Sequence, residues 1–257
     1  MALDYTDDLR LAHVLADDAD ALSTSRYKAL DLHVMTKPDL TPVTDADQTV
    51  EEGIRRTLSR ARPRDAVYGE EQGTTGHGQR CWVVDPIDGT KNFVRGVPVW
   101  ATLLALSDGD RMVVGVVSAP ALGKRWWAAR GSGSWTSDPD GSVRPCRVSQ
   151  VAQLGDAFLS YSSAADWQDG FDRLLSGVWR TRAFGDFWSH VLVAEGAVDL
   201  SGEPEVSLWD VAPLQVIVEE AGGRYTDLGG QARTDTGSIL CSNGLLHDAA
   251  LALLQAR

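Results

Sequence analysis

The sequence predicts a mixed α/β fold, and three observations carry that prediction. Apolar residues recur at helical spacing near the start of the chain. Three β-rich segments separated by turns follow between residues 99 and 129, and strand and helix patterns alternate from residue 157 onward. The length of 257 residues allows one large domain or two closely joined halves. We therefore expect residues 1–257 to form a single domain whose halves divide roughly as 1–150 and 151–257.

The first part of the chain predicts two helices joined by a loop. Residues 3–28 form an amphipathic helix in this reading, because their apolar positions are Leu9, Ala12, Leu15, Ala16, Ala19 and Leu22. Residues 36–42 contain two prolines and are predicted to be a loop. A second helix is expected over residues 46–60, and the arginines at 55, 56, 60, 62 and 64 are interpreted as a solvated helix face rather than a phosphate site.

Strands dominate the middle of the chain. The apolar run that begins at Trp82 indicates a buried strand, and Pro86 is expected to end its pairing because proline has no N–H to donate. Segments 99–107, 112–119 and 124–129 predict a meander of antiparallel strands, whereas residues 131–145 are rich in turn formers. In the meander, adjacent Trp126 and Trp127 must point to opposite faces, and the outward ring is a candidate for a dimer interface.

The last part of the chain predicts two further helices. Val211, Leu214, Val218 and Ala221 form the buried stripe of a helix over residues 208–221, which Gly222 and Gly223 end. A closing helix is expected over residues 246–254.

Charge and composition exclude several classes of function. A net charge of −12 argues against nucleic acid or an anionic membrane as the main partner. No apolar run approaches the roughly 20 residues of a membrane span, and the N-terminal residues lack the basic and apolar regions of a signal peptide. The three scattered cysteines are typical of reduced thiols, so a cytoplasmic protein is expected.

The most informative stretch is the string from Asp85 to Thr90. The two carboxylates of Asp85 and Asp88 are expected to converge at the end of the strand, next to the free backbone amides of Gly89 and Thr90, where a helix can begin. Paired carboxylates repel the anion that such amides attract. A divalent cation between them resolves the conflict and indicates metal-assisted chemistry on a phosphate.

Two further acidic positions are candidates for the same site. Glu70 follows a short apolar run just upstream of the strand, and Asp210 lies in the first turn of a late helix. Hard carboxylate oxygens from separate segments are the ligands that Mg²⁺ prefers. Taken singly, acidic residues at strand ends and helix starts are most often solvated turns and caps. The full string Asp-Pro-Ile-Asp-Gly-Thr is far more specific than its parts.

Three separated motifs resemble those of the inositol monophosphatase superfamily. They are Gly69-Glu70-Glu71, the string from Asp85 to Thr90, and Trp209-Asp210-Val211-Ala212 followed by Glu220-Ala221-Gly222-Gly223, with Pro42-Val43-Thr44-Asp45-Ala46-Asp47 as a further element. Their order and spacing match across nearly the whole chain. The resemblance implies a layered αβαβα sandwich and Mg²⁺-dependent hydrolysis of phosphate monoesters, without a covalent phosphoenzyme.

The resemblance also implies a role for each motif residue. Glu70, Asp85 and the carbonyl of Ile87 would hold one Mg²⁺, and Asp85, Asp88 and Asp210 a second, with two to three ions per site in all. Glu70 and Thr90 would position and activate the attacking water, and Asp47 would orient the Thr90 hydroxyl. The backbone amides of Gly89 and Thr90 would take phosphate oxygens. The expected substrate-binding residues are Asp88, Gly89, Thr90, Arg182, Asp186, Glu203 and Asp210.

The segment from Arg182 to His190 bears on the substrate. It keeps an arginine and a glycine of the inositol monophosphatases but has Asp186, Phe187 and Trp188 where they carry small residues. Its Gly-Asp-Phe-Trp-Ser-His run resembles the bacterial histidinol-phosphate phosphatases, a branch of the superfamily, as does the segment from Lys91 to Pro98. L-histidinol phosphate carries an ammonium and an imidazole, so carboxylates near the leaving alcohol would favour it.

Asp186 and Glu203 are the candidate carboxylates. Asp186 and its neighbours in the sequence also have structural explanations. Asp186 is equally well explained as a cap or first-turn residue of a helix through residue 194. Phe187 and Trp188 are better explained as core or interface aromatics, and His190 as a structural histidine.

The sequence leaves three functions open. The first is hydrolysis of L-histidinol phosphate, with neither nucleic acid nor membrane as a partner and, as the resemblance implies, by a homodimer. The second is an inositol monophosphatase or a broad sugar-phosphate phosphatase. The third is a non-catalytic metal-binding interaction protein, which the presence of Glu70, Thr90 and all three aspartates disfavours.

Overall fold

The protein is described by a computed structural model over residues 4–38, 40–165, 167 and 170–256. Its helices are α1 (Thr6–Arg26), α2 (Asp45–Ala61), α3 (Thr90–Arg95), α4 (Gly170–Gly177), α5 (Asp186–Glu195), α6 (Leu208–Glu220) and α7 (His247–Gln255), with 3₁₀ turns η1 (Pro120–Leu122) and η2 (Leu154–Asp156). The strands before residue 110 are β1 (Val34–Thr36), β2 (Pro42–Thr44), β3 (Ala66–Gly69), β4 (Gly73–Thr75), β5 (Arg80–Asp88) and β6 (Ala101–Asp108). The later strands are β7 (Arg111–Ala119), β8 (Lys124–Ala129), β9 (Ser134–Ser137), β10 (Val143–Pro145), β11 (Phe158–Ser160), β12 (Arg180–Arg182), β13 (Leu200–Glu203), β14 (Arg224–Thr226) and β15 (Ile239–Ser242).

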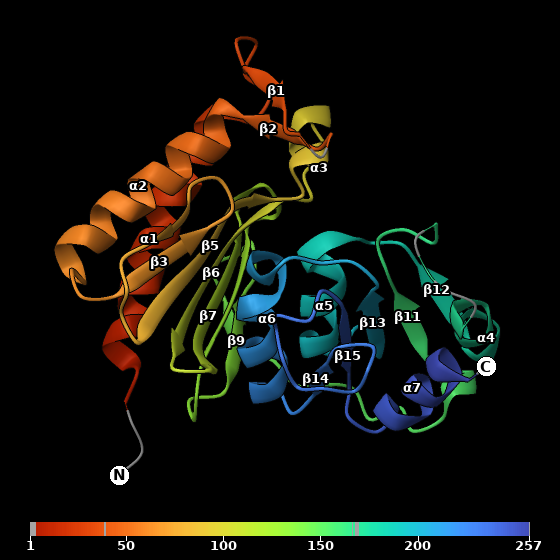
Figure 1. Cartoon of the computed structure of the whole chain (residues 1–257). Helices are drawn as coiled ribbons and strands as arrows, with labels where there is room; N and C mark the ends of the chain where they lie inside the picture. Colours follow the sequence, from red (N-terminus) through yellow and green to blue (C-terminus); the bar gives the residue numbers. More distant parts are fainter. Residues whose placement is uncertain (1–3, 39, 166, 168–169, 257) are drawn as a thin grey trace.

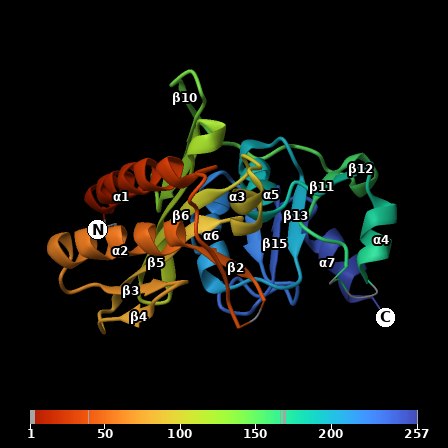
Figure 2. The same ribbon diagram turned by 90° about the horizontal axis from the view of Figure 1, so that it is seen from above.

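These elements stack in five layers (Figures 1 and 2). Helices α1 and α2 cover one face of a large sheet, and α5 and α6 lie between that sheet and a smaller one. Helices α4 and α7 pack together on the far side of the smaller sheet. The αβαβα arrangement expected from the motifs is therefore confirmed. The prediction of a single domain with two halves that divide near residue 150 stays a prediction.

The two sheets have different topologies. The large sheet has eight strands in the order β10-β9-β8-β7-β6-β5-β3-β4, and all neighbours are antiparallel except β3 and β5. The smaller sheet has five strands in the order β12-β11-β13-β15-β14, with β11 parallel to both of its neighbours. The parallel pair β3–β5 directs the ends of both strands toward the same edge of the large sheet.

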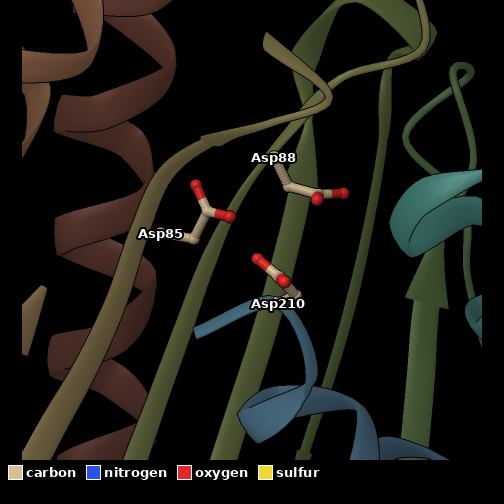
Figure 3. A group of neighbouring side chains, drawn as sticks. All are labelled: Asp85, Asp88 and Asp210. Carbon is tan, nitrogen blue, oxygen red and sulfur yellow. The ribbon is translucent and has the colours of Figure 1, made fainter. Parts of the chain in front are cut away.

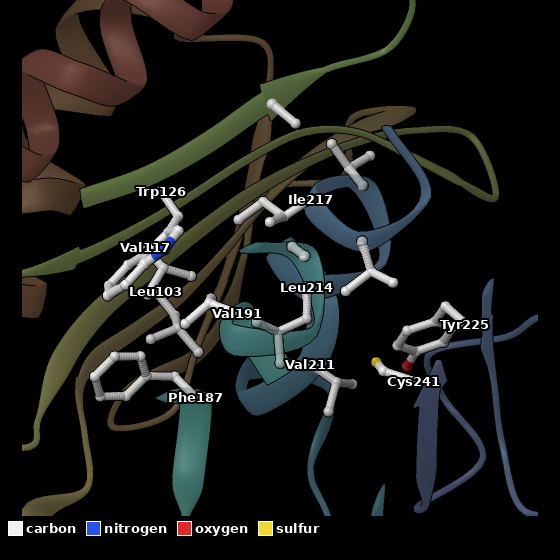
Figure 4. Packing of buried hydrophobic residues seen from close by; sticks show 14 of the residues in the cluster. Leu103, Val117, Trp126, Phe187, Val191, Val211, Leu214, Ile217, Tyr225 and Cys241 are labelled. Carbon is white, nitrogen blue, oxygen red and sulfur yellow. The ribbon is translucent and has the colours of Figure 1, made fainter. Parts of the chain in front are cut away.

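The main core lies between the large sheet and the middle helices (Figure 4). Leu103, Val117 and Trp126 of the sheet meet Phe187 of α5 and Leu214 of α6, and all five are buried. Each such side chain contributes on the order of 1.5–3 kcal/mol through the removal of apolar surface from water. The packing fixes α6, and with it the start of the helix, against the strands.

Close contact between α6 and the large sheet depends on Gly115 of β7. A Cβ at this position would lie 2.5 Å from the carbonyl oxygen of Pro213, which is inside α6. The absence of a side chain at Gly115 therefore allows the backbones of helix and strand to approach.

Two predictions of local structure differ from what is observed. Strand β5 does not stop at Pro86 but continues to Asp88, because a bulge accommodates the missing N–H. The turn-rich segment 131–145 also contains strands β9 and β10, which pair with each other. The loop predicted over residues 36–42 lies between strands β1 and β2, and its end residues Thr36 and Pro42 pair in those strands.

The other elements lie close to their predicted bounds. The helices expected over 46–60, 208–221 and 246–254 correspond to α2, α6 and α7, and the meander corresponds to β6, β7 and β8. The first helix begins at Thr6, and the predicted start at residue 3 lies outside the described residues. None of the helices in the described part of the chain combines the length and the apolar character needed to cross a bilayer.

Candidate active site

Asp85, Asp88 and Asp210 converge at the edge of the large sheet (Figure 3). The first two come from the end of β5 and the third from the first turn of α6. One carboxylate oxygen of each residue lies within 4.8 Å of the others. Asp210 is 122 positions from Asp88 in the chain, yet the fold brings its carboxylate next to those of Asp85 and Asp88, as the sequence predicted.

A bulge in β5 explains how Asp85 and Asp88 reach the same side. Asp85 pairs with Leu103 and Asp88 with Ala101, so two residues of β5, Pro86 and Ile87, stand opposite one residue of β6. Residues three apart in a regular strand point to opposite faces, and the extra residue reverses that alternation. The bulge is secured by the N–H of Ile87, which donates to Asp85 Oδ1 at 3.0 Å.

A capping box fixes Asp210. The N–H of Ser207 donates to Asp210 Oδ2 at 2.7 Å, and Ser207 precedes the first residue of α6. The positive end of the helix dipole favours a carboxylate at this position. Asp210 therefore uses one oxygen to begin the helix while its carboxylate remains part of the three-aspartate group.

The three carboxylates are electrostatically unfavourable without a cation. Burial is the main cause that raises the pKa of Asp85 and of Asp88 well above the ordinary value, and neighbouring carboxylates add to the effect. Burial likewise raises the pKa of Asp210 to about 7. Hard oxygen donors that repel one another in a buried site fit a small divalent cation, which would lower all three values.

Glu70 lines the same cavity but is held by a lysine. Its Oε1 accepts from Lys37 Nζ at 2.7 Å, and Lys37 also donates to Glu71 Oε1 at 2.7 Å. The charge of Glu70 and a hydrogen bond with it contribute to the raised pKa of Asp85, so Glu70 and Asp85 are neighbours. Lys37 was not anticipated as part of the site, because a lysine in the tip of a proline-rich loop matches no motif.

Thr90 stands between the aspartates and Asp47. Thr90 Oγ1 lies 2.9 Å from the carbonyl oxygen of Ile87 and 3.4 Å from Asp47 Oδ1. The other oxygen of Asp47 accepts from the N–H and the hydroxyl of Thr44, which caps α2. Burial raises the pKa of Asp47 to about 6. The predicted neighbourhood of Thr90 and Asp47 is therefore present.

Gly89 occupies a position that no other residue fills easily. It has φ of +79° and precedes α3. An added Cβ would lie 2.9 Å from the carbonyl oxygen of Val99. Both observations require glycine here.

Two adjoining cavities surround these residues. The first encloses about 270 Å³ beside the three aspartates. The second encloses about 450 Å³ and shares with the first the residues Thr41, Asp88, Lys91, Asp186 and Asp210. The second cavity is acidic, because Asp186, Glu203 and Glu205 all line it.

Asp186 is held toward the shared wall of the two cavities. It is the first residue of α5 and has φ of +49°, a conformation that non-glycine residues seldom adopt. Its Oδ2 accepts from Asn92 Nδ2 at 3.0 Å, and its N–H donates to Ser162 Oγ at 2.8 Å. No side chain caps α5, so the first-turn position is confirmed but the carboxylate does not serve as a cap.

Ser162 links Asp186 to Glu203. The Ser162 hydroxyl donates to Glu203 Oε1 at 2.6 Å. Burial raises the pKa of Glu203 to about 7 and also raises the pKa of Asp186. Neither Asn92 nor Ser162 was anticipated as part of the site from the sequence, because each acts by a contact between distant segments.

The remaining predicted residues differ in their relation to the cavities, because Arg182 lies away from both whereas Phe187 and His190 line the second one. Arg182 is exposed on the edge strand β12, donates to the carbonyl oxygen of Thr181, and lines neither cavity. Phe187 is buried, and Trp188 packs against the same core. His190 is buried, bonds Ser201 Oγ at 2.8 Å, and has its pKa lowered to about 3 by burial. The structural readings of these aromatic rings and of His190 fit these positions.

Two minor predictions need correction. The ring of Trp127 does not face outward to solvent, because it packs edge-on against His13 of α1 at 5.0 Å between ring centres. The arginine cluster is not simply a solvated face either. Arg55 pairs with Glu51 at 2.7 Å, and Arg62 with Asp8 at 3.0 Å.

Comparison with known proteins identifies the family. The model of the inositol monophosphatase family matches residues 5–257. Histidinol-phosphatases of Streptomyces coelicolor and Mycobacterium tuberculosis are each 57% identical to the chain, the first over 99% of both proteins and the second over 97% of this chain and 98% of the relative. The structure of an IMPase from Thermotoga maritima superposes with a TM-score of 0.87 at 30% identity, over 97% of each chain.

The chain belongs to the inositol monophosphatase family. The family predicted from the motifs is thus confirmed, and with it the prediction of a phosphoric monoester hydrolase. The family also supports metal dependence, with which the three-aspartate group agrees.

Proposed function

We propose that this protein hydrolyses L-histidinol phosphate to L-histidinol and phosphate, with Mg²⁺ as its metal. The observation that supports this choice of substrate is the acidic cavity that adjoins the three-aspartate group. The two relatives at 57% identity are both histidinol-phosphatases, which supports the same substrate.

The metal would be held by carboxylates of this chain. Glu70, Asp85 and the carbonyl of Ile87 would form one position, and Asp85, Asp88 and Asp210 a second, with a third ion near Glu70. When bound, Mg²⁺ would supply positive charge that stabilises the phosphoryl oxygens and favours ionisation of a water. The raised pKa values of Asp85 and Asp88 support this proposal, since such carboxylates are suited to a cation.

The chain's own groups would orient the attacking water and the phosphate. Thr90 and Glu70 would bind the water from two sides, and Asp47 would accept the hydrogen of the Thr90 hydroxyl so that its lone pairs face the water. The contact between Thr90 Oγ1 and Asp47 Oδ1 supports that orientation. The amides of Gly89 and Thr90 would bind phosphate oxygens at the start of α3.

The leaving alcohol would extend into the acidic cavity. L-histidinol carries an ammonium group and an imidazole, and Asp186 and Glu203 would bind these cationic or hydrogen-bonding groups. The hydrogen bonds from Asn92 and Ser162 hold both carboxylates in place before the substrate arrives, which lowers the entropic cost of binding. Glu205, exposed at the cavity rim, adds to the negative potential.

One further part of the proposal rests on the family resemblance. The protein would be a homodimer, whereas Arg182, which lines neither cavity, is given no contact with the substrate. Light scattering of the purified protein measures its mass, and a monomer at micromolar concentration would contradict the dimer.

The substrate is tested by kcat/KM for L-histidinol phosphate against inositol 1-phosphate and a sugar phosphate at one Mg²⁺ concentration. We expect a preference of at least about 100-fold for histidinol phosphate, since truncating a buried charged contact costs about 2–5 kcal/mol. Equal values would contradict the substrate and favour a broad phosphatase. Absence of turnover with every ester would favour a metal-binding interaction protein.

A further inference from the structure

The loop that carries Glu70 has every backbone amide engaged. This loop, Glu70-Glu71-Gln72, connects β3 to β4. The N–H of Glu70 donates to the carbonyl oxygen of Val84 at 3.1 Å. The amides of Glu71 and Gln72 both donate to Glu51 of α2, at 2.8 Å to Oε2 and 3.1 Å to Oε1. A helix thus holds the loop through one carboxylate.

Glu51 is a buried charge that is paired with the guanidinium of Arg55. Its side chain is 0% exposed, and its Oε1 accepts from Arg55 Nε at 2.7 Å, one helical turn along α2. The Arg55 guanidinium also donates to Thr75 Oγ1 at 2.9 Å and to the carbonyl oxygen of Gly73, both in β4. Glu51 therefore accepts from the amides of the loop, and Arg55 donates to strand β4, which follows the loop.

The backbone leaves room for Glu51 at Gly69. A Cβ on Gly69 would lie 2.3 Å from Glu51 Oε1 and 2.7 Å from Oε2, closer than any side chain tolerates. Gly69 has an ordinary negative φ, so its backbone conformation does not require glycine. The glycine is needed because the carboxylate occupies the place of a side chain.

A purely stabilising role explains this arrangement poorly. Removing a carboxylate and a guanidinium from water is costly, and well-packed apolar residues in place of a buried ion pair are often as stable or more so. The Glu51–Arg55 pair provides two acceptor oxygens at fixed positions under the amides of the loop, and apolar residues cannot provide them. Fixed backbone geometry matters most where the next side chain must meet a ligand.

We infer that Glu51 is a positioning residue for the metal site, which it serves by fixing the loop so that the Glu70 carboxylate stays beside Asp85. Gly69 and Arg55 complete this device, the first by admitting the Glu51 carboxylate and the second by neutralising it. The inference rests on the proposed function, in which Glu70 and Asp85 hold a metal ion.

The test is the affinity for Mg²⁺ in the absence of substrate, measured by titration calorimetry on the full chain. Glu51→Gln keeps the size of the side chain but has one acceptor oxygen, so at least one loop amide loses its acceptor and Arg55 loses its charged partner. We expect the Kd for Mg²⁺ to rise about 10- to 100-fold, the usual effect of removing a group that orients a metal ligand. With Mg²⁺ raised to saturation, kcat for histidinol phosphate should recover to within a few-fold of wild type.

Gly69→Ala tests the same device with all charges kept. The added methyl group must displace the Glu51 carboxylate, so this variant should also weaken Mg²⁺ binding at least several-fold. In a Glu51→Ala background the space is free, and Gly69→Ala should then have little further effect on Mg²⁺ affinity. Arg56→Met is the matched control, because Arg56 is exposed on the same helix. This variant should bind Mg²⁺ with the affinity of the wild type.

The outcomes separate this inference from the proposed function. Folded Glu51→Gln and Gly69→Ala proteins that are less stable to urea but bind Mg²⁺ with wild-type affinity would overturn the positioning role. Additive effects of Gly69→Ala and Glu51→Ala would overturn the role of the glycine. A wild-type protein that binds no Mg²⁺, or prefers another ester, would instead contradict the proposed function. If Glu51→Gln does not fold, the Mg²⁺ affinities of Gly69→Ala and Arg55→Lys test the same positioning role.

Discussion

Lys37 Nζ lies 2.7 Å from Glu70 Oε1, although the two residues are 33 positions apart. The lysine belongs to the tip of the β1–β2 hairpin, and both side chains are only 19% exposed. In the proposed site this ion pair occupies a carboxylate oxygen that a metal ion would use. A cation at the aspartates and the Lys37 ammonium therefore compete for Glu70.

The competition predicts that Mg²⁺ exposes Lys37 to chemical modification. In metal-free protein the ion pairs with Glu70 and Glu71 raise the pKa of Lys37 and so protect it from amine reagents. We expect saturating Mg²⁺ to increase the labelling rate of Lys37 about 3- to 10-fold, corresponding to about 1 kcal/mol of lost pairing. Peptide mass spectrometry measures the rate, and exposed Lys28 is the internal control. Equal protection with and without Mg²⁺ would show that Glu70 does not exchange Lys37 for metal.

Asp88→Asn should separate stability from catalysis. The substitution removes one of the mutually repelling buried charges and retains an oxygen to accept the N–H of Phe187, which donates to Asp88 Oδ2 at 2.8 Å. We expect metal-free Asp88→Asn to be as stable as wild type or more stable at pH 8, with turnover reduced at least about 1,000-fold.

Mg²⁺ itself should stabilise the wild type and much less the variant. A ligand present at 100 times its Kd adds about 2.7 kcal/mol to the free energy of unfolding. Urea unfolding with EDTA and with Mg²⁺ measures this difference. Asp110→Asn, an exposed carboxylate outside the site, is the control. Full activity of Asp88→Asn would refute the assignment of Asp88 as a metal ligand.

Local sequence patterns predicted the parts of this site that lie in one segment. The string from Asp85 to Thr90 and the first turn of α6 placed two aspartates and Asp210 at element ends, where the structure has them. The bulge at Pro86 was read as the end of the strand, because a missing N–H signals an interruption but not whether pairing resumes.

Contacts between distant segments were not predictable from the sequence. Lys37 and Ser162 carry no motif, and the segment that contains Asn92 does not indicate its partner, so each becomes part of the site only because the fold brings another segment within hydrogen-bond distance. Glu51 was hidden for a similar reason, since a glutamate inside an amphipathic helix ordinarily faces solvent. Strands β9 and β10 were missed because both are short and lie in a segment rich in Gly, Ser and Pro, whose composition is turn-like.

Asp186→Ala should impair binding of a cationic substrate more than catalysis in general. We expect KM for histidinol phosphate to rise about 10- to 100-fold, because a carboxylate that pairs with an ammonium group in a partly dehydrated cavity is worth about 1.5–3 kcal/mol. A small uncharged phosphate ester should show a change of less than about threefold. Steady-state kinetics with both esters measures the difference.

Asn92→Ala provides the matching test of how Asp186 is held. Asn92 donates to Asp186 Oδ2, so its loss should raise KM for histidinol phosphate in the same direction but less. The double variant should resemble Asp186→Ala alone, since Asn92 acts through the carboxylate. Equal changes for both esters in Asp186→Ala would return Asp186 to a structural role in the first turn of α5.

Buried His247 should make the fold sensitive to acid. Its Nδ1 lies 2.8 Å from Ser242 Oγ and its Nε2 2.9 Å from Thr226 Oγ1. The Thr226 hydroxyl donates to the carbonyl oxygen of Asp227, so it accepts from His247 Nε2–H, and in the neutral ring Nδ1 accepts from Ser242 Oγ. Burial is the main cause that lowers the pKa of His247 to about 4, from an ordinary value of 6.5.

The sign of the effect follows from proton uptake. Between pH 6.5 and pH 4 the unfolded chain binds a proton at this histidine and the folded protein does not, so the free energy of unfolding falls as the pH falls. At pH 4.5 the loss from this one group is on the order of 2–3 kcal/mol, at 1.36 kcal/mol per pKa unit. The buried carboxylates, whose pKa values are raised, act in the opposite direction, so the wild type alone is not informative.

The measurement is therefore the difference in urea-unfolding free energy between wild type and His247→Gln, with EDTA present, at pH 7.5 and pH 4.5. That difference should shrink by about 2–3 kcal/mol at the lower pH, because the variant has no proton to take up at this position. A difference that stays constant with pH would mean that folding does not lower the pKa of His247, against the burial of its ring.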